Sequence, residues 1–418
     1  MKKWKQLTKT ILASVMAFAM VAGYGASVAA APVAQDDTGV MGTNAQGIIG
    51  KNFEMTEGVA VPVATFNYNF TLLEIDSTDA DDLPATKTAA VAITTKSIAY
   101  SGGEVQPAAV GGIVTVSKDS ADVLAGIAWP HAGEYIYQVV ESATTGAASV
   151  VAKITNSQAE YKMVVHVENE LVGGTITGNV FVKLVEFIAV KNDDGSTTGA
   201  GAKKAPGFTN VYEELAPFEI SKMVTGKNAD ITFPFRYTLT MTRSPQVSAT
   251  ATSAYSAYIY TYNTVTSIWD RAATPLTITF AGDGSDATLD FTLTHNQKLV
   301  FEDAAKDLVL PTGTKYTLLE KLTGGLATEG EYVPSAEVVK NGGTAVTIGD
   351  GTQGVNLSTG AAAILGENTN SVAWNNLRAD VSPTGILLNN LPYILLIVVA
   401  LGGFAGYIVS KRRKQYAK

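Results

Sequence analysis

Residues 65–71 read TFNYNFT, so large apolar side chains alternate with polar ones along this stretch. A period of two is typical of a strand that buries one face, and Phe, Tyr and Thr favour strands. The same alternation recurs in EYIYQV at residues 134–139, whereas Gly, Asp, Asn and Ser cluster as turn signals at 193–196 and 282–285. The sequence therefore predicts an all-β protein built of sandwiches, each made of two packed antiparallel sheets.

The N-terminus has the pattern of an export signal. Four lysines within the first nine residues precede an apolar segment at 11–21, and small residues follow as far as Ala31. This order is typical of a secretory signal peptide, with cleavage after Ala29 or Ala30. We therefore expect residues 1–30 to be removed and the protein to be secreted.

The composition of the mature part excludes several classes of protein. All 38 Asp and Glu lie there but only 21 of the 30 Lys and Arg, so the net charge is 21 − 38 = −17. This balance argues against nucleic acid as a partner, because phosphates need a basic face. The chain has no Cys, and its three His are far apart in sequence, so we expect no disulfide, metal or cofactor. Since no G-x-S-x-G or phosphate-binding loop occurs either, a conventional enzyme is not expected.

The C-terminus combines a short motif with an apolar segment. Residues 381–385 read VSPTG, and the apolar stretch Leu391–Val409 is long enough to span a bilayer. The basic cluster KRRK at 411–414 would remain on the cytoplasmic side, so we expect a transmembrane helix over 391–410. An ordinary single-pass tail anchor is the alternative interpretation.

This arrangement resembles the sorting signal of Gram-positive surface proteins, in which a sortase cuts between Thr and Gly. The resemblance implies cleavage between Thr384 and Gly385. The usual signal is L-P-x-T-G, but Val381 and Ser382 replace Leu and Pro, and Pro383 directly precedes the Thr. The form x-x-P-T-G resembles the signals on pilus shaft subunits, which are joined to each other as well as to the wall.

The length of 418 residues predicts two or three domains between the two processed ends. The segment EELAP at 213–217 is a short polar link with one Pro, and strand-like stretches lie on both sides of it. We therefore expect one sandwich over residues 45–213 and a second over 217–380, followed by the sorting signal at 381–418.

A Lys, a Glu and an Asn recur in the same order in both halves. The residues are Lys51, Glu141 and Asn210 in the first half, and Lys222, Glu320 and Asn376 in the second. Strand alternation places Asn210 on the same face as Phe208, and aligning Trp374 with Phe208 favours Asn376, although the adjacent Asn375 remains an alternative. The other interpretation is that these are solvated strand and turn residues.

The repeated pattern resembles the intramolecular isopeptide domains of Gram-positive pilins and adhesins. The first half resembles the pilin isopeptide-linkage domain of streptococcal shaft pilins, and the second resembles an immunoglobulin-like or Cna-B-like domain. The resemblance implies two crosslinks, Lys51–Asn210 and Lys222–Asn376, each formed when the Lys amine displaces ammonia from the Asn amide with Glu141 or Glu320 assisting. Burial would lower the pKa of the Lys and raise that of the Glu, and the fold would supply proximity. Such a reaction occurs once, in cis, so it is self-processing and not turnover.

The two resemblances together predict a shaft (major) pilin, held first in the membrane and then attached covalently to the cell wall. Its partners would be a sortase, other copies of itself, tip and base pilins, and peptidoglycan. A shaft pilin also needs an exposed lysine to receive the Thr of the next subunit, and the resemblance points to Lys203 or Lys204, with Lys191 as a third candidate. The main alternative is a monomeric wall-anchored adhesin; a secreted surface enzyme would need a convergent polar pocket.

Overall fold

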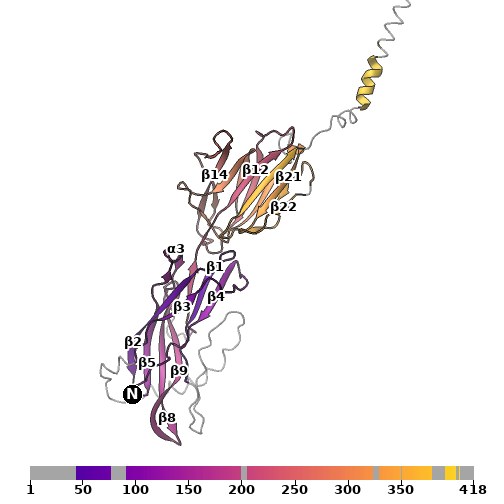
Figure 1. Cartoon of the computed structure of the whole chain (residues 1–418). Coiled ribbons are helices and arrows are strands. Elements are labelled where there is room, and N and C mark those ends of the chain that lie inside the picture. Colours follow the sequence, from indigo (N-terminus) through magenta and orange to yellow (C-terminus); the bar gives the residue numbers. More distant parts are fainter. Residues whose placement is uncertain are drawn as a thin grey trace, which may run out of the picture. The chain divides into compact units, whose positions relative to one another are not determined.

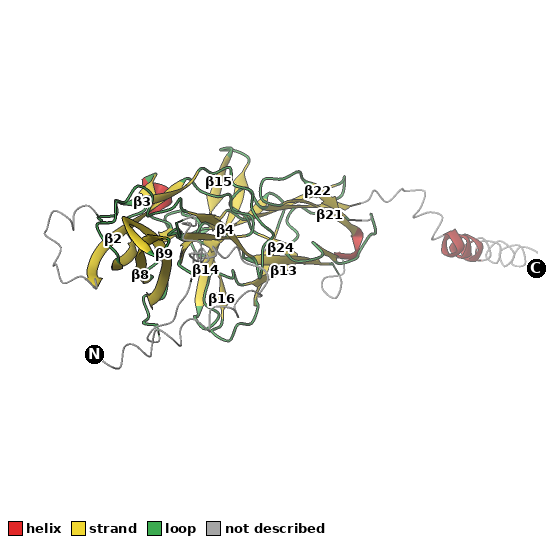
Figure 2. Cartoon of the chain, turned by 90° about the horizontal axis from the view of Figure 1, so that it is seen from below, coloured by secondary structure: helices red, strands yellow, loops and turns green. Residues whose placement is uncertain are grey.

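The computed structural model describes residues 44–76, 91–198, 205–322, 329–349, 351–378, 391–401 and 404. Strands predominate in these ranges, and the helices are short (Figures 1 and 2), so the predicted all-β fold is confirmed. The chain divides into two compact units, Met1–Glu214 (unit 1) and Leu215–Lys418 (unit 2). The predicted signal peptide, the sorting motif at 381–385, Lys203 and Lys204 lie outside the described residues.

Unit 1 is a sandwich of two sheets (Figure 1). The first sheet has the order β4 (Ile113–Asp119), β1 (Gly50–Thr56), β10 (Gly207–Tyr212) and β7 (Ile154–Thr155). The second has the order β3 (Lys96–Tyr100), β2 (Ala64–Asp76), β5 (Gly133–Glu141), β8 (Glu160–Val172) and β9 (Thr175–Lys191), with β6 (Thr145–Gly146) paired to β2. The short helix α3 (Ala148–Val151) precedes β7.

Residues 65–71, whose side chains alternate between apolar and polar, form part of strand β2. Phe66 and Tyr68 are buried in the core of unit 1, whereas Asn67 and Asn69 point outward. Ser97 on the neighbouring strand β3 donates a hydrogen bond to Asn67 Oδ1 at 2.8 Å. The period of two therefore separates an aromatic inner face from a polar outer face.

Unit 2 is a second, larger sandwich. One sheet has the order β15 (Ile268–Arg271), β14 (Ser253–Asn263), β18 (Gln297–Phe301), β12 (Glu219–Thr225), β25 (Ser371–Arg378), β21 (Tyr332–Val339) and β22 (Val346–Ile348), with β16 (Leu276–Phe280) on β14. The other has the order β17 (Ala287–Leu293), β13 (Phe235–Thr242), β20 (Lys315–Lys321) and β23 (Leu357–Ser358), with β24 (Ala363–Ile364) on β20. Three small elements also belong to the unit: β11 (Leu215–Ala216) pairs with β19 (Leu310–Pro311), and η1 (Glu329–Glu331) precedes β21.

The first and last long strands of each unit are parallel neighbours. Strand β1 pairs with β10 in unit 1, and β12 pairs with β25 in unit 2. Every other strand pairing in the described part of the chain is antiparallel. Each unit is thus closed by bringing the two ends of its own chain segment side by side.

Residues 391–401 and 404 are helical. Among the residues with described positions, no helix is long and apolar enough to cross a membrane. The helix that the sequence predicts for 391–410 falls in part outside those residues.

Candidate crosslinking sites

The parallel strand pairs place a Lys and an Asn diagonally opposite each other. In unit 1, Lys51 of β1 is in register with Phe208 of β10, and Phe53 is in register with Asn210. Residues two apart on a strand share a face, so the Lys and Asn side chains both point into the core. Both residues are fully buried, at 1% and 0% exposure.

Unit 2 repeats this register. Lys222 of β12 is opposite Trp374 of β25, and Val224 is opposite Asn376. Lys222 and Asn376 are buried, at 3% and 0% exposure. The same offset of two residues therefore occurs in two sandwiches whose strand orders differ.

The Glu of each site comes from the opposite sheet. Glu141 is the last residue of β5 and Glu320 lies within β20, and neither strand belongs to the sheet that holds the Lys and the Asn. Both glutamate side chains are almost completely inaccessible. Each site is thus assembled across the core from both layers of a sandwich.

The three side chains of unit 1 form a closed hydrogen-bonded ring. Lys51 Nζ lies 2.7 Å from Glu141 Oε2 and also donates to Asn210 Oδ1. Asn210 Nδ2 in turn donates to Glu141 Oε1 at 2.5 Å. The amine, the amide carbonyl and the carboxylate that the proposed chemistry needs are therefore in direct contact.

The surroundings of this ring are aromatic. Lys51 Nζ lies 4.1 Å from the centroid of the Phe66 ring. Burial lowers the pKa of Lys51 to about 8, although the carboxylate of Glu141 opposes the shift. Burial also raises the pKa of Glu141, against the influence of Lys51. Both shifts favour the neutral forms, an amine that can attack and a carboxyl that can donate a proton.

Unit 1 adds two contacts that the sequence did not reveal. The backbone N–H of Ser157 donates to Asn210 Oδ1 at 3.0 Å, and Asn210 Nδ2 donates to Asn156 Oδ1 at 3.1 Å. Thr144 Oγ1 holds that same Asn156 oxygen at 2.5 Å. An Asn-Ser pair in sequence is a turn signal and indicates no partner, so only the fold could show this contact.

The site of unit 2 is centred on one carboxylate oxygen. Glu320 Oε1 accepts hydrogen bonds from Lys222 Nζ at 2.7 Å, Asn376 Nδ2 at 2.8 Å and the hydroxyl of Tyr237 at 2.9 Å. Glu320 Oε2 and Asn376 Oδ1 are buried, and neither has a hydrogen-bond partner among the described residues. Two acceptor oxygens of the same site are thus left unsatisfied.

Lys222 has the same kind of environment as Lys51. Its Nζ lies 4.0 Å from the ring centroid of Phe235, and burial lowers its pKa to about 8 against the pull of Glu320. Asn375, the alternative crosslinking residue, points the other way, and its Oδ1 accepts from Thr225 Oγ1 at 3.1 Å. The structure therefore brings Asn376 to the Glu and keeps Asn375 on the outer face.

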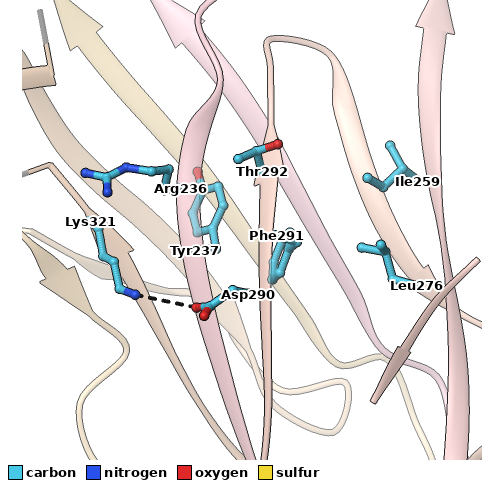
Figure 3. A pocket seen from close by; sticks show the side chains of 8 residues that line it. All are labelled: Arg236, Tyr237, Ile259, Leu276, Asp290, Phe291, Thr292 and Lys321. Carbon is cyan, nitrogen blue, oxygen red and sulfur yellow. Dashed lines mark hydrogen bonds and ion pairs between the residues drawn. The ribbon is translucent and has the colours of Figure 1, made fainter. Parts of the chain in front are cut away.

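The role of Tyr237 was not inferred from the sequence, although it shares a face with Phe235. Tyr237 also lines an open hollow of about 530 Å³ together with Phe291, Ile259 and Leu276 (Figure 3). Arg236, Thr292, Asp290 and Lys321 complete the lining, and Lys321 Nζ lies 3.4 Å from Asp290 Oδ1. Tyr237, which lines this hollow, is also the residue whose hydroxyl donates to Glu320 Oε1.

The remaining predicted residues lie apart from these sites or outside the described ranges. Lys191 ends β9, is 44% exposed and forms an ion pair with Glu160 at 2.8 Å. Lys203, Lys204 and the sorting residues Val381 to Gly385 fall in ranges that the structure does not describe. Within the described ranges, no group of His, Cys, Asp and Glu could hold a metal ion.

Comparison with known families assigns the two units separately. Residues 49–213 match the Spy0128-like isopeptide containing domain, and residues 217–357 match a domain of unknown function, DUF7601. A search of curated proteins gave no significant match.

Among solved structures, the chain is similar to major pilins of Streptococcus pyogenes. One of these is 15% identical, with 80% of this chain and 99% of that chain covered and a TM-score of 0.32. Another, the major pilin protein T3.2 of Streptococcus pyogenes serotype GAS13637, is 17% identical, with 84% of this chain and 100% of that chain covered and a TM-score of 0.32. The match of residues 49–213 to the Spy0128-like isopeptide containing domain confirms the resemblance of the first half to a pilin isopeptide domain.

Proposed function

We propose that the protein is the shaft subunit of a covalent Gram-positive pilus, and that each unit is locked by a self-formed Lys–Asn isopeptide bond. The observation that carries this proposal is the buried Lys, Glu and Asn set that occurs at the same register in both units. Burying a charged amine in an aromatic core costs free energy. Both units nevertheless bury a Lys, although their strand orders differ. A covalent product would remove both the buried charge and its desolvation penalty.

The reaction in unit 1 follows from the geometry of the ring. One proton moves from Lys51 to Glu141, and the neutral Nζ then attacks Asn210 Cγ. A Cγ–Nζ bond forms and the Cγ–Nδ2 bond breaks. Nζ then releases a second proton and Nδ2 gains one through Glu141, so the amide nitrogen leaves as ammonia and Glu141 keeps the proton that it first took from Lys51, as a neutral carboxyl. The fold holds the reacting groups in contact, so the step is effectively unimolecular.

In unit 2 the same reaction would join Lys222 Nζ to Asn376 Cγ, and Glu320 contacts both side chains through Oε1. Tyr237 donates to that same oxygen and thereby holds the carboxyl group in place.

The location of the bonds suits a fibre under tension. In unit 2, load enters near Leu215 and leaves after Arg378, and a bond between β12 and β25 would carry it past the strands between them. In unit 1, load that enters at the receiving lysine, Lys191, Lys203 or Lys204, would reach the link at 213–217 along the chain through β10. The bond from Asn210 to Lys51 would then tie β10 to β1 beside this path.

Assembly would use the C-terminal signal. A sortase would cut between Thr384 and Gly385 and transfer Thr384 to the receiving lysine of another copy, and finally to peptidoglycan. Recognition would rest on Val381, Ser382 and Pro383. The product is a surface fibre attached to the cell wall, to which tip and base pilins can be joined.

The experiment that tests the proposal is the intact mass of recombinant residues 31–380 with Glu141→Ala and Glu320→Ala variants. The wild-type chain should lack the mass of two ammonias, and each variant the mass of one. The full chain, incubated with the cognate sortase, should then give a ladder of covalent multimers. An unmodified mass would remove the isopeptide bonds from the proposal, and a monomeric product would favour a wall-anchored adhesin.

A further inference from the structure

The carboxamide of Asn210 is held at all four of its hydrogen-bonding positions. Its Nδ2 donates to Glu141 Oε1 and to Asn156 Oδ1, and its Oδ1 accepts from Lys51 Nζ and from the backbone N–H of Ser157. An amide side chain offers two donors and two acceptor positions, so no further contact is possible. The amide therefore has one defined orientation, with nitrogen and oxygen not interchangeable.

Asn376 is not held in this way. Its Nδ2 donates to Glu320 Oε1, whereas its Oδ1 is buried without a partner among the described residues. No backbone N–H described in unit 2 occupies the place that Ser157 takes in unit 1. The difference is local to the Asn, because the Lys, the Glu and the register are common to both sites.

We propose that Asn156 and Ser157, in the turn between β7 and β8, complete the first site: Ser157 N–H stabilises the developing oxyanion, and Asn156 orients the leaving amine. This inference rests on the proposed isopeptide chemistry and adds positioning groups that the second site lacks. Attack by Lys51 turns the Asn210 carbonyl oxygen into a negatively charged one. A fixed N–H already directed at that oxygen stabilises the charge without reorganisation.

The contact of Asn156 belongs to the reactant and not to the product. Once Nδ2 has left as ammonia, Asn156 Oδ1 loses this donor and keeps the one from Thr144. Asn156 is exposed, whereas Lys51 and Asn210 are buried. The leaving nitrogen therefore faces the side of the site that is nearest to solvent, which gives ammonia a way out.

Rates of bond formation test this proposal directly. The chain is made by cell-free synthesis, stopped with acid at timed intervals, and the crosslinked peptide of each unit is quantified by mass spectrometry. Asn156→Ala should slow the Lys51–Asn210 bond about fivefold, since it removes one ordinary hydrogen bond. Asn156→Asp retains an acceptor oxygen and should recover most of the rate. The Lys222–Asn376 bond of the same molecule serves as the internal control.

Ser157 is tested by a pair of variants. Ser157→Pro removes the N–H and should slow the first bond about 10²-fold, as the loss of an oxyanion donor does in other enzymes. Ser157→Ala keeps the N–H and removes the hydroxyl that donates to Asp193, so it should slow the first bond far less than Ser157→Pro does. If Ser157→Pro does not fold, the comparison of Asn156→Ala with Asn156→Asp decides.

The outcomes separate a positioning role from a structural one. After complete reaction, Asn156→Ala should melt within a few degrees of the crosslinked wild type, because the contact with Asn210 is already absent from the product and only the hydrogen bond from Thr144 is lost. An unchanged rate of bond formation in Asn156→Ala would overturn the inference, whatever its melting temperature. If the wild-type chain forms no bond in either unit, it is the isopeptide chemistry itself that fails.

Discussion

Lys222 and Trp374 are directly paired across the parallel strands β12 and β25, and Asn376 follows two residues later on the same inner face. Unit 1 has the equivalent pair, Lys51 opposite Phe208, with Asn210 two residues later. In both units a large, buried aromatic residue is therefore the partner of the Lys on the adjacent parallel strand. A Lys–Asn bond along this diagonal would join the first and last long strands of each sandwich directly.

The choice between the adjacent asparagines can be tested by a matched pair of variants. Asn376→Ala should abolish the crosslink of unit 2, because its amide is the one that contacts Glu320. Asn375→Ala should retain the crosslink, because that side chain faces Thr225 on the outer surface. Intact mass distinguishes them by one ammonia. A crosslink that survives in Asn376→Ala would contradict the assignment.

Loss of the crosslink in unit 1 should lower its stability markedly. The bond would close a loop between residues 159 positions apart, worth about 5 kcal/mol in the chain-entropy model. Glu141→Ala, which blocks the bond, should therefore lower the melting temperature of unit 1 by roughly 10–20 °C. Calorimetry of residues 31–380 would show one transition shifted and the other in place. Lys183→Ala, which removes an exposed ion pair with Glu168, is the control and should change little.

The rate of bond formation in unit 1 should depend on pH with a maximum. The reaction needs one proton shared by Lys51 and Glu141, since with two the amine is charged and with none the carboxyl cannot donate. The pKa of Lys51 is lowered to about 8, so the rate should fall as pH rises through about 8 and the pair loses this proton. The raised pKa of Glu141 places the acidic limb above the usual range for a carboxyl. Refolding of unreacted chain from inclusion bodies at pH 4 to 10, with timed mass detection, would measure both limbs, and a rate that rises steadily to pH 10 would rule out the carboxyl as acid.

Unit 2 should not extend under force once it is crosslinked. A bond between Lys222 and Asn376 shields the 376 − 222 = 154 residue steps between them from tension. In single-molecule pulling from both ends of the mature chain, Glu320→Ala should add an unfolding step of roughly 500 Å that the wild type lacks. The same step in the wild type, in molecules shown by mass to be crosslinked, would mean that load does not pass through this bond.

The receiving lysine can be identified by single substitutions in the polymerisation assay. Lys191 is tied to Glu160 at 2.8 Å, and an amine held in an ion pair is a poorer nucleophile. We therefore expect Lys191→Ala to form multimers and either Lys203→Ala or Lys204→Ala to remain monomeric. A ladder from both of the latter variants and none from Lys191→Ala would reverse the assignment.

The sequence by itself determined the strands, because a period of two is a local property that follows from the pleat of an extended chain. It also indicated the repeated order of Lys, Glu and Asn, and the resemblance supplied the chemistry. The sequence did not predict the register between β1 and β10, because this register depends on the packing of two strands separated by more than 150 positions in sequence. Nor did the sequence predict that Glu141 and Glu320 lie on the sheet opposite to the one that holds the Lys and the Asn.

Only the tertiary structure showed how the two sites differ. Asn156 and Ser157 reach Asn210 because the turn before β8 lies over the end of β10, and Tyr237 reaches Glu320 because β13 and β20 are neighbours. Neither contact leaves a pattern in the sequence, because a backbone N–H has no residue type and a buried Tyr resembles any other core aromatic. The sequence states which side chain each residue carries. The partner of each hydrogen bond at these sites depends on strands and turns that come together only when the chain folds.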